Sequence, residues 1–331
     1  MNRSFPYADH FVGKKILVTG GTGFIGSHLV RCLIGLGATV HVAIRPGTDC
    51  WRVKDMERQI HFHELSLEDA VSVNKLVMYC NPACLFNFAY PGQLQAEDPI
   101  SLQSYISSIT RITMNLLEAA REHATPRVFH ACSSTIYGNS GQPVFKESDP
   151  LLPDSTRGFI KLHARNLCIL YAKKWHVPVI LGRIFRAYGP WDSDKKLLTK
   201  ALDAYYTKRP IQLTDPDIKR DYIFIDDLIH CILLACICDL PAGTEINMGS
   251  GKERSVQEII QVLEEILGGT IPVDTDTPYS LKEIDKTHWA ADVSKAKHLL
   301  GWHPTTSLKE GIRNVVAWYE SYRIKTPDPL S

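Results

Sequence analysis

Short apolar segments alternate with longer amphipathic ones through the first half of the chain. Residues 15–19 form an apolar run typical of a buried strand, and residues 27–35 have the apolar period of a helix. Glycines concentrated in residues 20–26 separate the two segments and indicate a turn. Because the alternation continues, we predict an α/β protein with a Rossmann-type doubly wound parallel sheet. Further strands are predicted at 40–44, 85–89, 127–132 and 177–183, and longer helices at 101–123 and 159–175.

The regular alternation fades beyond residue 186. Prolines and glycines interrupt shorter segments there, and amphipathic helical patterns recur at 256–267 and 308–322. We therefore predict a larger domain over residues 1–185 and a smaller C-terminal lobe over residues 186–331, with some segments exchanged between them. A cleft between two such lobes is the expected place for a ligand.

Composition and charge narrow the classes of partner. The 37 basic and 36 acidic residues give a net charge of +1, so no nucleic-acid or membrane-surface partner is predicted. The chain has no apolar run near the roughly 20 residues that span a bilayer. Its nine cysteines show no metal-ligand spacing and are expected to be reduced thiols of a cytoplasmic protein.

The glycine-rich turn carries the clearest ligand signal. It reads Thr-Gly-Gly-Thr-Gly-Phe-Ile-Gly at a predicted strand-to-helix junction, where glycines let backbone amides approach a pyrophosphate at the helix N-terminus. The candidate contacts are Gly20, Thr22, Gly23, Phe24, Ile25 and Gly26.

This glycine spacing resembles the fingerprint of extended short-chain dehydrogenase/reductases, a group that contains nucleotide-sugar epimerases, dehydratases and ketoreductases. The resemblance extends over nearly the whole chain and implies an NAD(P)-binding first domain, a substrate-binding second lobe and a homodimer formed through the helices at 101–123 and 159–175. It also implies that Glu64 and Leu65 contact adenine and that Ala89 and Lys161 contact the rest of the cofactor.

The residue at the end of the second predicted strand indicates whether the cofactor is NAD or NADP. An acidic residue there would bind the ribose hydroxyls of NAD, but this chain has Arg45, which can bind the 2′-phosphate of NADP. Arg31 on the first predicted helix could assist. We predict NADP(H), with NAD as the alternative. His61 and His63 alternate without further ligands nearby in the sequence, so no metal site is predicted.

A hydroxyl-rich segment follows the strand predicted at 127–132. By its resemblance to the family's active-site segment, Ser133 would bind the reacting oxygen, with Ser134 and Thr135 facing the substrate. Dehydratases of the family carry Asp and Glu where this chain has Ser134 and Thr135, so sugar dehydration is disfavoured.

The family pattern then requires Tyr-x-x-x-Lys on one helix face, and here Lys161 is present but Arg157 occupies the tyrosine position. A guanidinium stays protonated, so Arg157 can only bind an anionic group or stabilise negative charge. Another residue supplies the proton, or the reaction needs none from the protein, or the site is silent. Tyr90 is the first substitute; Tyr137, Tyr188 and His163 are weaker candidates.

Two arginines are suited to the diphosphate of a nucleotide sugar. Arg186 replaces an Asn of the family pattern, and Arg220 lies in a Lys-Arg-Asp segment that resembles the family's diphosphate clamp. The sequence therefore favours an NADP(H)-dependent ketoreductase or epimerase acting on a nucleotide-activated sugar. A non-catalytic NADP-binding sensor and an NADPH-dependent reductase of a non-nucleotide ketone remain open.

Overall fold

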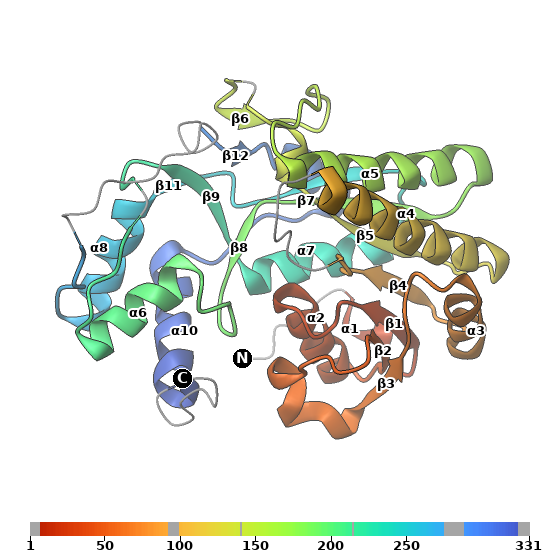
Figure 1. Cartoon of the computed structure of the whole chain (residues 1–331), viewed down its shortest axis with the longest axis horizontal. Coiled ribbons are helices and arrows are strands. Elements are labelled where there is room, and N and C mark those ends of the chain that lie inside the picture. Colours follow the sequence, from red (N-terminus) through yellow and green to blue (C-terminus); the bar gives the residue numbers. More distant parts are fainter. Residues whose placement is uncertain (1–6, 92–98, 140, 214, 275–287, 324–331) are drawn as a thin grey trace.

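A seven-stranded parallel sheet forms the centre of the computed structural model, which describes residues 7–91, 99–139, 141–213, 215–274 and 288–323. Its strands are β1 (Lys15–Thr19), β2 (Thr39–Ile44), β3 (Ile60–Glu64), β4 (Cys84–Asn87), β5 (Val128–Ser133), β7 (Val179–Ile184) and β10 (Glu245–Met248). They lie in the order β10-β7-β5-β4-β1-β2-β3, and every neighbouring pair is parallel (Figure 1). The predicted doubly wound sheet is confirmed.

Apolar residues on both faces of the strands explain why helices cover both sides of this sheet. In β1, Ile16 and Val18 belong to one buried cluster and Leu17 to another, and all three are fully buried. A continuous apolar run of this kind is typical of a parallel strand between two helical layers. The helices on the first face are α2 (Phe24–Gly35) and α7 (Ile225–Ile237), and those on the second are α3 (Ala70–Cys80), α4 (Pro99–Glu122) and α5 (Thr156–Trp175).

Smaller elements surround the carboxyl ends of the large sheet. A three-stranded sheet has the order β11-β9-β8, in which β8 and β9 are parallel and β9 and β11 antiparallel, and β6 pairs with β12. The strands are β6 (Val144–Phe145), β8 (Arg186–Tyr188), β9 (Lys219–Phe224), β11 (Glu253–Ser255) and β12 (Ala290–Ala291). The remaining helices are α1 (Ala8–Phe11), α6 (Leu197–Thr207), α8 (Val256–Leu267), α9 (Ser294–Leu300) and α10 (Leu308–Trp318), with 3-10 helices at Trp51–Gln59 and Ser134–Ile136.

The helices predicted after residue 186 have clear local causes. The predicted range 256–267 coincides with α8, which begins where Ser255 and Glu258 form a capping box and ends at left-handed Gly268. The pattern predicted at 308–322 is α10 followed by a π-helical turn, Tyr319–Arg323.

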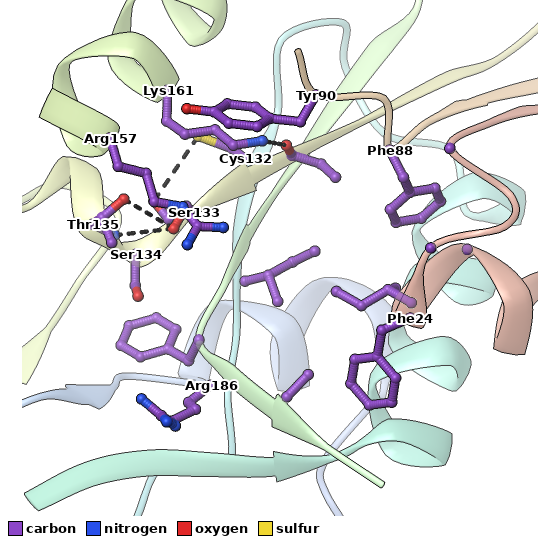
Figure 2. Close-up of a pocket in the computed structure, with 18 of the residues that line it drawn as sticks. Phe24, Phe88, Tyr90, Cys132, Ser133, Ser134, Thr135, Arg157, Lys161 and Arg186 are labelled. Atoms are coloured by element: carbon purple, nitrogen blue, oxygen red, sulfur yellow. Dashed lines mark hydrogen bonds between the residues drawn. The ribbon is translucent and has the colours of Figure 1, made fainter. Parts of the chain in front are cut away.

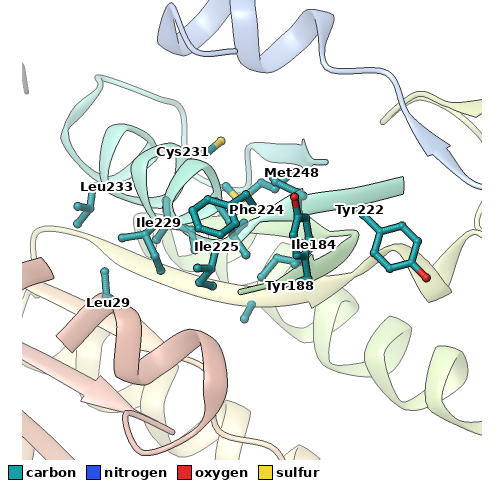
Figure 3. Close-up of a cluster of buried hydrophobic side chains, with 14 of the residues drawn as sticks. Leu29, Ile184, Tyr188, Tyr222, Phe224, Ile225, Ile229, Cys231, Leu233 and Met248 are labelled. Atoms are coloured by element: carbon teal, nitrogen blue, oxygen red, sulfur yellow. The ribbon is translucent and has the colours of Figure 1, made fainter. Parts of the chain in front are cut away.

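One apolar cluster joins the two sheets. Ile184 and Met248 of the large sheet, Tyr188 and Phe224 of the small sheet, and Ile229 of α7 all belong to it (Figure 3). The strand β10 lies in the large sheet although it follows residue 186 in the chain. The division at residues 185 and 186 therefore stays a prediction, and the two parts share a core.

Within the described residues, no helix is long and apolar enough to cross a membrane. All nine cysteines lie in the described part of the chain and are free thiols.

Candidate active site

A cavity of about 580 Å³ opens at the carboxyl ends of β1, β4, β5 and β7. The residues that line it follow or end these strands, and others come from α5, β8 and β9 (Figure 2). This edge, where the strand order reverses beside β1, is where ligands bind in open parallel sheets. Thirteen of the predicted site residues line the cavity: Gly20, Gly23, Phe24, Ile25, Gly26, Tyr90, Ser133, Ser134, Thr135, Arg157, Lys161, Arg186 and Arg220.

The glycine-rich turn forms one wall of this cavity. A Cβ atom on Gly26 would lie 2.2 Å from the backbone oxygen of Gly20, so only glycine allows the first turn of α2 to approach the end of β1. Gly23 is the N-cap of α2, and its side-chain-free position exposes the amides at the start of the helix. The turn therefore fits a bound pyrophosphate.

The other predicted cofactor residues lie outside the cavity lining. Arg45 directly follows β2 and is exposed. The register pairs Ile44 with Glu64, and the backbone N–H of Leu65 donates to the Ile44 oxygen over 2.9 Å. Arg45, Glu64 and Leu65 thus meet at the ends of two neighbouring strands. Thr22 and Ala89, which are also predicted to contact the cofactor, are likewise outside the cavity lining.

Arg31, predicted to assist with NADP, is paired elsewhere in this structure, so its assistance stays a prediction. Its guanidinium donates to both carboxylate oxygens of Asp55 over 2.6 Å and lies 4.5 Å above the Trp191 ring. A forked ion pair of this geometry occupies the donors that a phosphate would need.

Two of the three hydroxyls after β5 form a hydrogen-bonded pair. The Ser133 Oγ atom accepts from the Thr135 backbone N–H over 3.3 Å and from the Thr135 hydroxyl over 3.0 Å. Because both acceptor positions of Ser133 are used, its own proton is available to another oxygen. The hydroxyl of Ser134 instead accepts from the Trp289 indole over 2.9 Å.

The start of α5 brings Arg157 and Lys161 to the same cavity. The Ser155 side chain caps the helix by accepting from Gly158 N–H over 3.2 Å. A Cβ on Gly158 would lie 2.6 Å from the Thr135 oxygen, so glycine permits the close packing of α5 against the hydroxyl segment. Figure 2 shows Arg157 extending from α5 toward that segment.

Lys161 is buried and donates from Nζ to the Ala131 oxygen over 3.1 Å. Burial, with a smaller contribution from the positive charge of Arg157, lowers the pKa of Lys161 to about 8. Unlike Arg157, this side chain can therefore exchange a proton near neutral pH.

Tyr90 lies across Lys161, with its ring centroid 4.7 Å from the lysine Nζ (Figure 2). Its hydroxyl is fully buried and has no hydrogen-bond partner among the described residues, and burial raises its pKa. Tyr90 lines the cavity, and a proton donor must come within hydrogen-bond reach of the reacting oxygen. Its role as the substitute acid stays a prediction.

The weaker substitutes have structural partners. The Tyr137 hydroxyl donates to Asn247 and accepts from Arg183, both over 2.7 Å, and Tyr188 is buried in the shared core. His163 contacts the hydroxyl of Thr110 over 2.8 Å. None of the three lines the cavity.

The far end of the cavity is rich in positive charge. Arg186 lies over the Tyr222 ring at 5.4 Å and Arg220 over the Trp289 ring at 5.8 Å. Lys196 joins them, whereas Asp192 is the one carboxylate among the described lining residues. With Arg157 and Lys161, five of the described lining residues are basic, which suits a ligand with several phosphate charges.

Sequence reasoning missed Asp192, Lys196 and Trp289. Burial raises the pKa of Asp192, which accepts from the Ser193 N–H over 2.7 Å. Trp289 is held by β9, because the backbone N–H of Asp221 donates to its oxygen over 2.9 Å. No local pattern could reveal that Trp289 meets Ser134, which lies 155 residues earlier in the chain.

The fold and the cavity define an α/β protein of the extended short-chain dehydrogenase/reductase class. The sequence profile described as GDP-mannose 4,6 dehydratase matches residues 17–315. The chain belongs to this family.

The relatives support this assignment. An uncharacterized UDP-glucose epimerase of Bacillus subtilis is 27% identical over 316 residues, which cover 93% of this chain and 98% of the relative. The structure of UDP-glucuronic acid 4-epimerase from Bacillus cereus, in complex with UDP-glucuronic acid and NAD, has a TM-score of 0.80 at 25% identity and covers 92% of this chain and 99% of that one. An epimerase structure from Methanothermobacter thermautotrophicus, at 21% identity and a TM-score of 0.85, covers 97% of both chains and supports the fold. The predicted class of nucleotide-sugar enzyme is confirmed at the level of the family.

Proposed function

We propose that this protein is an NADP(H)-dependent ketoreductase or epimerase acting on a nucleotide-activated sugar. The observation that carries the proposal is the single cavity in which Ser133 and Lys161 face the glycine-rich turn at one end and Arg186 and Arg220 line the other. Such a cavity suits two phosphate-bearing molecules held beside each other. The UDP-sugar epimerases among its relatives agree with this substrate class.

The residues present fit a nicotinamide dinucleotide. Gly26 leaves room where a side chain would fill the turn, and the start of α2 presents free amides to a pyrophosphate. We assign the 2′-phosphate of NADP to Arg45, with Glu64 and Leu65 beside it; NAD, present in the related structures, is the alternative. When bound, the dinucleotide supplies hydride transfer to or from a sugar carbon.

The hydroxyl and ammonium groups would serve the sugar oxygen. Ser133 donates its free proton to that oxygen, because Thr135 occupies its acceptor positions. Lys161 is our candidate for the proton-exchanging group, since its pKa lies near 8. Tyr90 could take this role only by turning its hydroxyl into the cavity.

We assign Arg157 to holding an anionic group or a developing negative charge on the substrate. Its guanidinium cannot exchange a proton, but it lines the cavity close to the hydroxyl segment. Ser134 and Thr135 face the substrate and lack the carboxylates needed for water elimination, so dehydration ranks below reduction and epimerisation.

Arg157 also favours a second candidate, a non-catalytic NADP-binding sensor. A protein that lost its acid/base tyrosine while keeping the phosphate turn would look like this one. A reductase of a non-nucleotide ketone fits less well, because such a substrate would leave Arg186 and Arg220 without a diphosphate to bind.

The test is turnover of a panel of UDP-, GDP- and dTDP-linked sugars and their 4-keto forms. Ketone reduction consumes NADPH, whereas epimerisation changes the sugar configuration without net cofactor consumption, which NMR detects. We expect turnover with at least one nucleotide sugar and none with the free keto sugar. Tight NADPH binding without turnover of any of them would favour the sensor.

We also propose a homodimer in the cytoplasm. Outward-facing apolar residues of α4 and α5 include Met114, Phe159 and Leu170, which are 40%, 58% and 47% exposed. Such a surface suits a helical interface between copies. Phe159→Glu should convert a dimer to a monomer in light scattering, and a wild-type monomer would refute the interface.

A further inference from the structure

Three potential metal ligands gather at the β3 end of the large sheet, away from the cavity. His41 comes from β2, His63 from β3 and Cys80 from the last residue of α3. One ring nitrogen of each histidine and the sulfur of Cys80 all lie within 4.8 Å of one another. His41 and Cys80 are buried and His63 is half-buried. The proposed function uses none of these groups.

Register and packing explain why residues so distant in sequence meet. His41 pairs with His61 across β2 and β3, and side chains two residues apart on a strand share a face, so His63 lies on the same face as His41. The helix α3 packs over this side of the sheet through Val73 and Val77. Its last residue, Cys80, therefore lies beside the two rings.

The hydrogen bonding of the cluster is incomplete without a further partner. His41 Nδ1 and His63 Nε2 lie 2.9 Å apart and share one hydrogen bond, and the two rings stack at 5.2 Å. The second nitrogen of His41 is buried and has no partner among the described residues. Buried polar atoms of this kind are rare, and an ion or a water usually accounts for them.

A stacked histidine pair could by itself fill the edge of the sheet, and a buried cysteine could pack as a small apolar residue. That explanation accounts for the contacts but leaves His41 Nε2 unsatisfied. An ion bound by His41 through Nε2, together with one nitrogen of His63 and the sulfur of Cys80, would satisfy this atom. Two imidazoles and one thiolate are a donor set that suits zinc.

We propose that His41, His63 and Cys80 bind a zinc ion, with water as the fourth ligand. Zinc bonds of about 2.0–2.1 Å to nitrogen and about 2.3 Å to sulfur place the donors roughly 3.3–3.7 Å apart, so donors that lie up to 4.8 Å apart move closer on binding. On binding, the Cys80 thiol loses its proton to solvent and its sulfur forms the bond to the ion. The ion would tie β2, β3 and α3 together one residue before Glu64.

The test begins with the full chain, stripped of metal by chelation and dialysis, then given one equivalent of zinc or cobalt. Elemental analysis should find about one ion per chain after desalting. Bound cobalt should show the thiolate charge-transfer absorption and the intense visible bands of tetrahedral coordination. Zinc should raise the melting temperature by about 5 °C or more, because it binds the folded state alone.

Variants locate the ion. Cys80→Ser and His63→Asn should each weaken zinc binding by at least about 100-fold, since each removes one of three protein ligands. Two matched controls should keep it: Cys50→Ser removes a half-buried thiol elsewhere, and His61→Asn removes the imidazole that stacks on His41 outside the donor set.

The cobalt spectrum of the wild-type chain keeps the test decisive if Cys80→Ser fails to fold, because the charge-transfer band reports sulfur ligation directly. Absence of stoichiometric metal, cobalt bound without that band, or equal binding by wild type and His63→Asn would each overturn the proposal. Because no readout involves turnover, failure here leaves the proposed sugar chemistry intact.

Discussion

Two parts of the cavity lining, the glycine-rich turn and the start of α5, differ in which groups face the ligand. At the glycine-rich turn the ligand-binding groups are backbone amides, and the requirement on the sequence is the absence of a side chain at Gly26. At the start of α5 the relevant groups are the side chains of Arg157 and Lys161, and Gly158 serves only to bring them close to the hydroxyl segment.

This difference explains how binding and chemistry can diverge within one site. A Cβ atom added at Gly26 would collide with the backbone. The side chain at position 157, by contrast, lines the open cavity, so a substitution there can be accommodated without moving the helix. The cap at Ser155, the contact at Gly158 and the position of Lys161 are all present with Arg157 in place. The surroundings of position 157 are therefore those of a capped helix start beside a buried lysine, and Arg157 stands where the family resemblance leads us to expect a tyrosine.

The largest effect is expected at the turn. Gly26→Ala places a Cβ 2.2 Å from the Gly20 backbone oxygen, so the start of α2 must shift. Its backbone N–H groups then no longer point at the pyrophosphate. We expect NADPH affinity to fall at least about 100-fold, since a charged ligand loses several hydrogen bonds at once. Calorimetric titration measures this.

Gly35→Ala is the matched control in the same helix, because open space surrounds its Cβ position. It should retain wild-type affinity. Equal affinity of Gly26→Ala and wild type would show that the cofactor does not use this turn, and the contrast between the two parts of the lining would disappear.

A smaller but still large effect is expected at Arg157. Arg157→Ala should lower kcat about 100-fold, as loss of one charge-stabilising donor commonly does, while NADPH affinity changes less than about twofold. Steady-state kinetics measures kcat, and a binding titration of the same samples measures NADPH affinity. Arg157→Tyr sharpens the comparison: turnover by this variant where the wild type shows none would favour the non-catalytic sensor.

The parallel sheet was predictable from sequence because each strand is a short apolar run followed by a punctuating turn. The segment at 15–19 coincides with β1, and 256–267 coincides with α8, where cap residues mark both ends. Short strands such as β8 and β12 could not be predicted, because they exist through pairing with distant segments and carry little local preference.

The site residues likewise fall into those that the sequence could predict and those that it could not. Gly26 and Lys161 belong to local motifs and could be named in advance. Trp289 and the partnership of His41 with Cys80 depend on tertiary contacts alone. The burial of the Tyr90 hydroxyl beneath Lys161 likewise depends on how α5 packs, which no spacing reveals.

The pH profile tests whether Lys161 provides the chemistry at the α5 end. Its pKa is lowered to about 8 by burial first and by Arg157 second. Ketone reduction needs the protonated ammonium, so kcat should fall about tenfold per pH unit once the pH exceeds this value. In Arg157→Ala the break should move to higher pH, because one lowering influence is gone. A profile that is flat from pH 6 to about pH 10 would exclude Lys161 as the acid.

Arg45, which lies outside the cavity lining, tests cofactor choice. Arg45→Ala should weaken NADPH binding about tenfold and leave NADH binding unchanged, since only NADPH carries the 2′-phosphate. Arg58→Ala, another exposed arginine, is the control and should change neither. Equal losses for both cofactors would contradict the assignment of Arg45, and tighter NADH than NADPH binding by wild type would identify NAD as the cofactor.

Tyr90→Phe is expected to have the smallest effect on stability and kcat. The substitution removes a buried hydroxyl that has no hydrogen-bond partner among the described residues, while the ring beneath Lys161 remains. Relief of that desolvation should stabilise the fold by about 1 kcal/mol or leave it unchanged, and kcat should stay within about twofold of wild type. Thermal unfolding and initial rates measure the two quantities on one preparation. A 100-fold loss of kcat with unchanged stability would instead show that the hydroxyl turns into the cavity during turnover, so that Tyr90, which follows β4, supplies the proton in place of Lys161.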